Sequence, residues 1–135
     1  MNEKTKLKLN LLGPDFVLAP DGSEIRPLQE TTRGGLSECT LPVDGISSAV
    51  CHKTVEEIWL FTQGSGQVWR NLKNTEQIDD VLPGTSLLIP LGTHFQFRNT
   101  GKTPLKFIIS TMPAWPGPTE AYPCLLYTSP SPRDQ

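Results

Sequence analysis

The sequence lacks the features that would suit it to nucleic acid or to a membrane. Lys and Arg number 12 against 14 Asp and Glu, the net charge is -2, and no basic run could neutralise several phosphates. No stretch reaches the roughly 18 consecutive apolar residues of a membrane-spanning helix, and the charged beginning has no apolar signal-peptide core. We therefore expect a soluble, cytoplasmic protein with neither nucleic acid nor membrane as a partner.

Cysteine and helical patterning are also scarce. The three cysteines, Cys39, Cys51 and Cys124, are neither clustered nor spaced as in a metal ribbon. A disulfide framework or a zinc knuckle is therefore not expected. No segment carries an apolar stripe at helical spacing, so the fold has to be built from something other than helices.

What the sequence does contain is frequent punctuation by glycine and proline. Between these breakers lie short runs rich in Val, Ile, Leu, Phe, Trp and Thr, a pattern typical of β-sandwiches and barrels. The length suits a single domain with one core. The predicted strands are 15–18, 24–28, 36–41, 48–52, 57–62, 67–71, 77–81, 86–89, 95–99 and 105–111.

The C-terminal run CLLYTSPSPRD, which begins at Cys124, has a different character. It lacks strand alternation and follows the loop-like segment PAWPGPTEAYP. The run resembles the translation of a sequencing adapter that has been read through into an open reading frame. We therefore expect residues 124–135 to be a non-native tail, and they carry no site argument.

Two blocks of residues further upstream have a spacing that is typical of one known protein family. The first block has glycine, glutamate and glycine at the family's positions, and the second, GTSLLIPLGTHFQFRN, has its glycines, proline and asparagine. The matched residues are Gly45, Glu57, Gly64, Gly84, Pro90, Gly92 and Asn99. The chain thus resembles a single-domain cupin of the RmlC-like superfamily.

This resemblance implies an all-β fold, the double-stranded β-helix or jelly-roll barrel. It places an N-terminal arm and first strands in residues 1–35, the barrel core in 36–112 and a C-terminal loop in 113–123. A cupin barrel is also expected to bind a small-molecule ligand or substrate in its cavity and to pair with a second copy as a homodimer.

The family's metal-ligand positions are mostly occupied by other residues. In the strict spacing Cys51 and Lys53 stand where two histidines are expected and Phe95 where the third is expected, so only Glu57 remains. His52 and His94 are each one position away. Because successive strand residues face opposite sides, this spacing favours a barrel without a cofactor.

A second spacing keeps a metal site open. If the longer permitted gap before the glutamate is used, His52 becomes a ligand with Glu57 five residues later. A β-bulge after Pro90 would turn His94 inward. His52, Glu57 and His94 would then form a two-histidine, one-carboxylate site for one divalent metal such as Fe, Mn or Zn.

Strand alternation also indicates which side chains form the pocket. Glu57 shares its face with Trp59 and Phe61, so it is expected to point inward while Glu56 points outward. A buried carboxylate needs a partner, and Lys53 is the nearest cation in sequence. The predicted catalytic residues are Glu57 and Lys53, and the predicted pocket residues are Cys51, Trp59, Phe61, Phe95 and Phe97.

Three functions follow from these residues and from the resemblance. The first is an isomerase- or epimerase-like cupin enzyme in which Glu57 acts as general acid or base. The second is a metal-dependent cupin, dioxygenase- or decarboxylase-like, that uses His52, Glu57 and His94. The third is a barrel that binds or senses a ligand without catalysis. Sequence alone does not decide between them, because one fold supports many chemistries.

Overall fold

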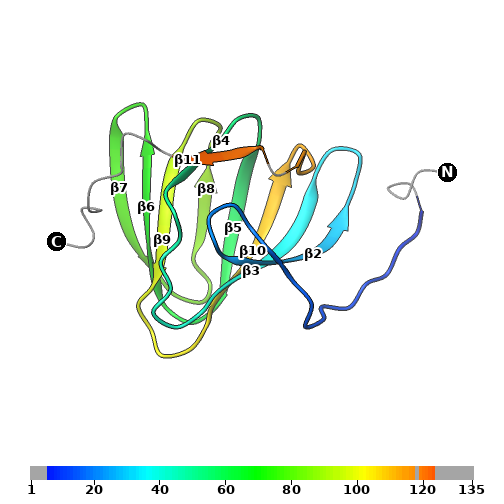
Figure 1. The fold of residues 1–135 in the computed structure, drawn as a ribbon, viewed down its shortest axis with the longest axis horizontal. Helices are drawn as coiled ribbons and strands as arrows, with labels where there is room; N and C mark the ends of the chain where they lie inside the picture. Colours follow the sequence, from blue (N-terminus) through cyan, green and yellow to red (C-terminus); the bar gives the residue numbers. More distant parts are fainter. Residues whose placement is uncertain (1–5, 118, 124–135) are drawn as a thin grey trace.

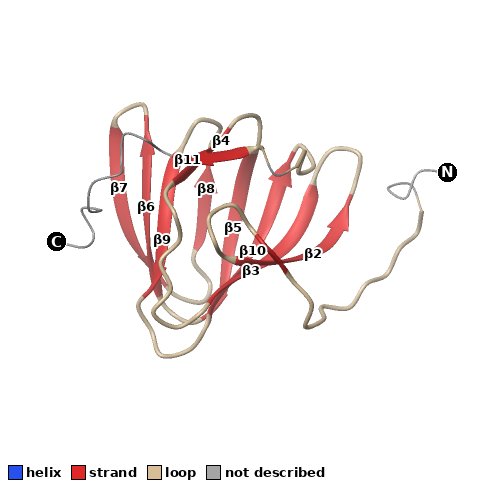
Figure 2. Ribbon diagram, viewed as in Figure 1, coloured by secondary structure: helices blue, strands red, loops and turns tan. Residues whose placement is uncertain are grey.

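The structure is a computed structural model that describes residues 6–117 and 119–123. The predicted adapter-derived tail, including Cys124, lies outside the described residues. All regular structure in the described part is β, as Figure 2 shows by its colouring. Within that part, the search for a helix long and apolar enough to cross a membrane finds none.

In the described part of the chain, eleven strands form two antiparallel sheets that face each other (Figure 1). One sheet has the order β1-β2-β3-β10-β5-β8 and the other the order β11-β4-β9-β6-β7. Consecutive strands often fall in different sheets, so the chain winds between the two layers. The strands are β1 (Val17–Leu18), β2 (Glu24–Glu30), β3 (Gly35–Leu41), β4 (Val50–His52), β5 (Glu56–Gln63), β6 (Gly66–Leu72), β7 (Thr75–Val81), β8 (Ser86–Ile89), β9 (His94–Asn99), β10 (Leu105–Met112) and β11 (Ala121–Pro123).

The core lies between the sheets because the strands alternate as the sequence predicts. Along β5, β8 and β10 every second side chain is buried, which is the period-2 pattern of a strand with one covered face. Trp59 of β5 is the centre of an aromatic group, with its ring centroid 4.5 Å from Phe107 and 5.3 Å from Phe95. The inward residues of both sheets therefore form one shared core.

The structure confirms all ten predicted strands and adds an eleventh. The segment 113–123, predicted to be a loop, ends in β11, which pairs with β4 so that Tyr122 lies opposite Cys51. Three residues that end in proline carry no readable alternation, so the sequence could not indicate this strand. Its pairing extends the five-stranded sheet beyond β4.

A glycine is required at the turn between β5 and β6. Gly64 has a φ of +82°, and a Cβ atom at this position would lie 2.8 Å from the carbonyl oxygen of Pro104. Gly84 also has a positive φ, +95°, but has open space around it. Gly64 is thus needed both for its positive φ and because a side chain would clash with Pro104, whereas Gly84 is needed only for its positive φ.

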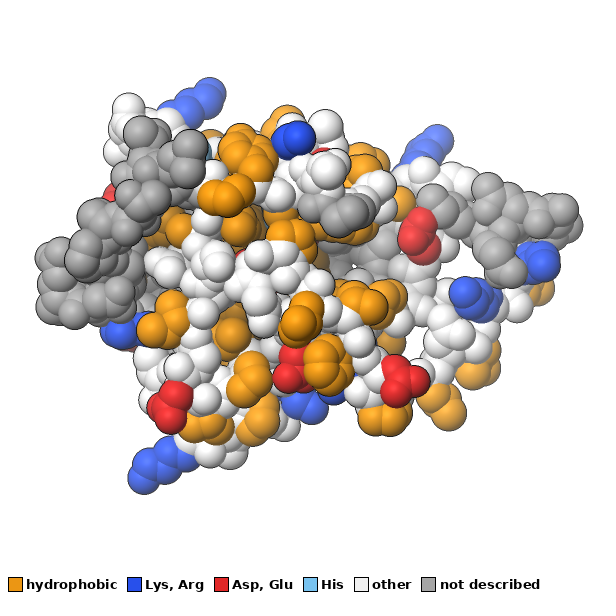
Figure 3. All heavy atoms as spheres, in the orientation of Figure 1, with side chains coloured by type: hydrophobic (Ala, Val, Ile, Leu, Met, Phe, Trp, Pro, Cys, Tyr) orange, Lys and Arg blue, Asp and Glu red, His pale blue; other side chains and the backbone are white. Residues whose placement is uncertain are grey.

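Charged side chains are dispersed on the face of the molecule drawn in Figure 3, where Lys and Arg stand apart from one another among exposed hydrophobic groups. Several of the exposed apolar residues lie on the outer face of the six-stranded sheet, including Ile58, Leu60 and Leu88. Others, Leu7, Leu9 and Leu11, lie on the N-terminal arm. The expected homodimer stays a prediction.

Candidate functional site

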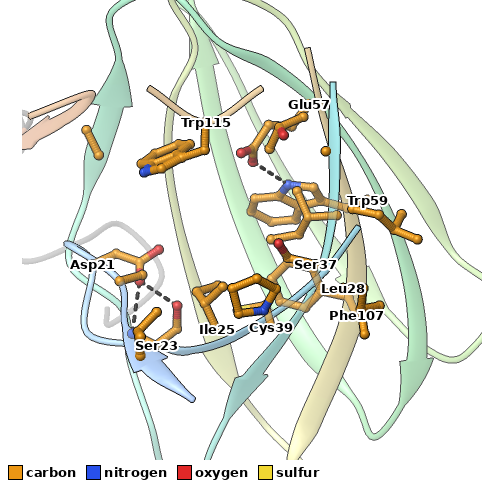
Figure 4. A pocket seen from close by; sticks show the side chains of 18 of the residues that line it. Asp21, Ser23, Ile25, Leu28, Ser37, Cys39, Glu57, Trp59, Phe107 and Trp115 are labelled. Atoms are coloured by element: carbon orange, nitrogen blue, oxygen red, sulfur yellow. Dashed lines mark hydrogen bonds between the residues drawn. The ribbon is translucent and has the colours of Figure 1, made fainter. Parts of the chain in front are cut away.

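A cavity of about 750 Å³ opens on the inner face of the six-stranded sheet. Its walls come from β2, β3, β5 and β10, from Val50 and His52 of β4, from two phenylalanines of β9, and from the segments before β2 and after β10. Two residues of the N-terminal arm, Lys8 and Asn10, lie at its rim. Figure 4 shows the side chains of its interior.

Glu57 is the buried carboxylate of this cavity, as the strand alternation predicts. Its side chain is 5% exposed, and its Oε1 accepts a hydrogen bond of 2.8 Å from the indole Nε1–H of Trp59 (Figure 4). Burial raises the pKa of Glu57 from 4.5 to about 7, against the opposing effect of the Trp59 hydrogen bond, and the charges of Asp21 and Glu120 raise it further. Glu57 therefore changes its protonation state near neutral pH.

His52 is the nearest titratable neighbour of Glu57. Its Nδ1 lies 3.9 Å from Glu57 Oε2 and makes no hydrogen bond to the described residues. The ring stands edge-on between Phe95, at 5.2 Å, and Trp115, at 5.1 Å. Burial lowers the pKa of His52 from 6.5 to about 4, although the charge of Glu120 acts in the opposite direction. The imidazole is therefore neutral at pH 7.

The aromatic wall of the cavity contains three of the predicted pocket residues, and Trp115 and Phe107, which were not predicted, complete it. Trp59, Phe95 and Phe97 line the cavity together with Trp115. Phe61 does not line it, although it is buried. Its ring packs on Phe107, with the centroids 4.6 Å apart, so that it supports the wall from within the core.

Cys51 and Lys53 do not take the places predicted for them. Cys51 is buried but is not part of the cavity wall, and its Sγ accepts a hydrogen bond of 3.4 Å from the hydroxyl of Tyr122. Lys53 is exposed in the turn after β4. Both predictions were made from positions along the sequence, Cys51 from the spacing of the first block and Lys53 as the cation nearest to Glu57, whereas in the sheet Val50 lies opposite Phe95. Directly paired residues share a face, so Val50 and His52 point inward.

The alternative metal site is not assembled either. β9 pairs with β4 and β6 without a register shift, and it is Phe95 and Phe97 of this strand that line the cavity. His94 therefore lies on the opposite face of β9, so the alternative spacing, which needed a bulge after Pro90 to turn His94 inward, is not met. No group of three or more His, Cys, Asp or Glu side chains within residues 6–117 and 119–123 could hold a metal ion. His52 and Glu57 alone do not make a three-ligand site.

Several cavity residues were not predicted from the sequence. Asp21 and Ser23 come from the turn before β2, and Cys39 comes from β3 (Figure 4). Asp21 Oδ1 accepts hydrogen bonds from the backbone N–H and the hydroxyl of Ser23, at 2.9 and 2.6 Å. Burial raises the pKa of the Cys39 thiol well above its usual range, and the charge of Asp21 adds to this. Cys39 is therefore a protonated thiol and not a nucleophile.

Glu120 joins the C-terminal segment to the turn between β4 and β5. Its carboxylate accepts hydrogen bonds from Thr54 N–H (2.6 Å), Thr54 Oγ1 (2.7 Å) and Val55 N–H (2.9 Å). Burial would raise the pKa of Glu120, but these hydrogen bonds outweigh it and lower the pKa. The contact holds the segment that carries Trp115 and Ala121 against the cavity.

Solved structures with the same architecture identify the fold. The cupin domain of Cnp3 from Schizosaccharomyces pombe matches with a TM-score of 0.60 and 14% identity, over 67% of this chain and 64% of that one. The chain has the cupin jelly-roll fold. BH2720 from Bacillus halodurans matches with a TM-score of 0.63 and 22% identity, over 69% and 72% of the two chains. An oxalate oxidase in complex with glycolate matches with a TM-score of 0.67 and 21% identity, over 87% and 61%.

Comparison at the level of sequence adds nothing to this result. No family model matches the chain, and no curated protein matches it. At these identities the structural likeness establishes the cupin fold and leaves the chemistry to be argued from the site itself.

Proposed function

We propose that this cupin protein binds a small molecule in the cavity between its sheets and exchanges a proton with it through Glu57. The observation that carries the proposal is a buried carboxylate in the wall of a large, mostly apolar cavity, with a pKa of about 7. Cavities with aromatic walls and a few convergent polar groups are the usual form of small-molecule sites. An oxalate oxidase of the same fold has a structure in complex with glycolate, which supports the binding of a small molecule as the function.

The environment of Glu57 supports a role in general acid–base chemistry. A group with a pKa near the working pH can both accept and donate a proton. Oε1 is held by Trp59, so Oε2 is the oxygen left to react with a ligand proton. The neutral imidazole of His52, 3.9 Å away, is placed to relay that proton or to orient the ligand. Removal of a proton from one ligand atom, followed by its return to the opposite face of that atom or to a neighbouring atom, is the core of an epimerase or isomerase reaction.

The test compares two neighbouring glutamates of β5. Glu57→Gln keeps the shape and the acceptor for the Trp59 indole but removes the titrating group. Glu56→Gln is the matched control, because Glu56 is exposed on the opposite face. After a thermal-shift screen has found a ligand, hydrogen–deuterium exchange into that ligand is measured by NMR. Glu57→Gln should abolish the exchange and Glu56→Gln should leave it unchanged.

The other outcomes separate the alternatives. A ligand that binds in the cavity without any exchange in the unmodified protein would favour the non-catalytic binding barrel. Exchange that persists in Glu57→Gln would remove Glu57 as the acid–base group.

A further inference from the structure

The charged groups that line the interior of the cavity are acidic. Asp21 and Glu57 are its inner carboxylates, and Glu30 adds a third at an exposed position. Within residues 6–117 and 119–123 the wall contains no arginine, and its one lysine, Lys8, is exposed on the N-terminal arm. Burial raises the pKa of both carboxyl groups, that of Glu57 to about 7, so the interior becomes negatively charged as they ionise and has no fixed positive charge to pair with an anion.

Each inner carboxylate makes its hydrogen bonds to a neighbouring residue through one oxygen. Asp21 uses Oδ1 for both hydrogen bonds from Ser23, and Glu57 uses Oε1 for the bond from Trp59. Glu57 Oε2 accepts no hydrogen bond from the described residues, and the nearest titratable nitrogen to it is His52 Nδ1 at 3.9 Å. A carboxylate oxygen that faces a cavity is a favourable place for an incoming N–H group, above all a charged one.

Aromatic rings stand beside these oxygens. Figure 4 shows Glu57 and Trp115 at one end of the cavity, the indole of Trp59 next to Glu57, and Asp21 across the open space. The face of an aromatic ring carries the negative part of its quadrupole and attracts cations, tryptophan most strongly. Carboxylate and aromatic groups thus favour the same sign of ligand charge.

We propose that the cavity is selective for a cationic ligand, an organic amine whose ammonium group binds between Glu57 and Asp21 and whose apolar part packs on Trp59 and Trp115. This assignment rests on the proposed small-molecule function of the same cavity. An anion of equal shape would be placed beside two carboxylates without a compensating cation, and that repulsion is a means of exclusion. A neutral analogue would gain hydrogen bonds but neither the ion pair nor the cation–π contact.

The test uses three probes with one aromatic frame and different charges: 2-phenylethylamine, 2-phenylethanol and phenylacetate. Binding is followed by the indole N–H resonances in two-dimensional NMR. Trp59 and Trp115 line the cavity, whereas Trp69 is buried elsewhere and serves as the internal reference. The amine should bind at least about tenfold more tightly than either analogue, which corresponds to about 1.4 kcal/mol, and should shift Trp59 and Trp115 but not Trp69.

Variants then locate the charge. Glu57→Gln and Asp21→Asn, which keep the hydrogen-bond acceptors toward Trp59 and Ser23, should each weaken amine binding about tenfold or more and leave the alcohol nearly unaffected. Glu76→Gln removes an exposed carboxylate of β7 outside the cavity and should change neither.

The possible failures are distinct. If the alcohol or the acid binds in the cavity as tightly as the amine, the charge assignment is overturned and small-molecule binding stands. The same conclusion follows if amine binding is insensitive to both Glu57→Gln and Asp21→Asn. If none of the three probes shifts Trp59 or Trp115 even in the millimolar range, the charge assignment fails and the proposed function is weakened with it.

Discussion

Replacing Glu57 with glutamine should reveal a pH dependence of stability that the unmodified protein conceals. In the folded protein burial raises the pKa of Glu57 from 4.5 to about 7 and lowers that of His52 from 6.5 to about 4. Between pH 4.5 and 6.5 the pair therefore carries one proton in both states, on Glu57 when folded and on His52 when unfolded. The slope of the unfolding free energy with pH depends on the difference in bound protons between the unfolded and folded states. Over this range the slopes due to Glu57 and His52 therefore cancel.

Each residue alone gives a slope of opposite sign. The pKa of Glu57 is raised on folding, so its contribution is fully present below pH 4.5 and is lost as the pH rises through about 7. The pKa of His52 is lowered, so its contribution is present above pH 6.5 and is lost as the pH falls through about 4. Between roughly pH 7.5 and roughly pH 5 each contribution changes by about 2 kcal/mol, whereas their sum changes little because the two changes have opposite signs.

The assay is urea unfolding followed by tryptophan fluorescence at a series of pH values. Relative to the unmodified protein, Glu57→Gln should lose about 2 kcal/mol of unfolding free energy from roughly pH 7.5 to roughly pH 5, and His52→Gln should gain about as much. Groups elsewhere in the chain cancel in this comparison. Glu56→Gln, on the exposed face of β5, should match the unmodified profile. If Glu57→Gln and His52→Gln also give the pH profile of the unmodified protein, the account of a buried pair with opposite pKa shifts is refuted.

Three further predictions concern the hydrogen bonds and the turns. Glu120→Ala leaves two backbone N–H groups without their acceptor and should lower the unfolding free energy by about 3 kcal/mol in urea; an unchanged midpoint would contradict the anchoring role of this carboxylate. Trp59→Phe removes the donor to Glu57, so the pKa of that carboxyl, followed by carbon NMR, should rise rather than fall. Gly64→Ala should cost about 2 kcal/mol or more and Gly84→Ala about 1, because only the first also meets a carbonyl oxygen; equal losses would argue against that steric contact.

The sequence by itself determined the architecture and the identity of the inward carboxylate. Alternation of apolar residues between glycine and proline breakers is a local signal, because side chains of a strand point to opposite faces in turn. It indicated the strands, and it placed Glu57 on the buried face with Trp59, as the structure has them. The resemblance to cupins, carried by the spacing of the glycines, Pro90 and Asn99, indicated the barrel.

Tertiary structure decided which other side chains join Glu57. His52 faces the cavity because Val50 pairs with Phe95, and that pairing joins segments more than forty residues apart. Asp21, Cys39 and Trp115 reach the same space from three separate segments. Alternation along one strand does not fix the register between strands, and register determines which faces meet. The chain thus specifies its strands locally, whereas the composition of its cavity depends on how those strands pair.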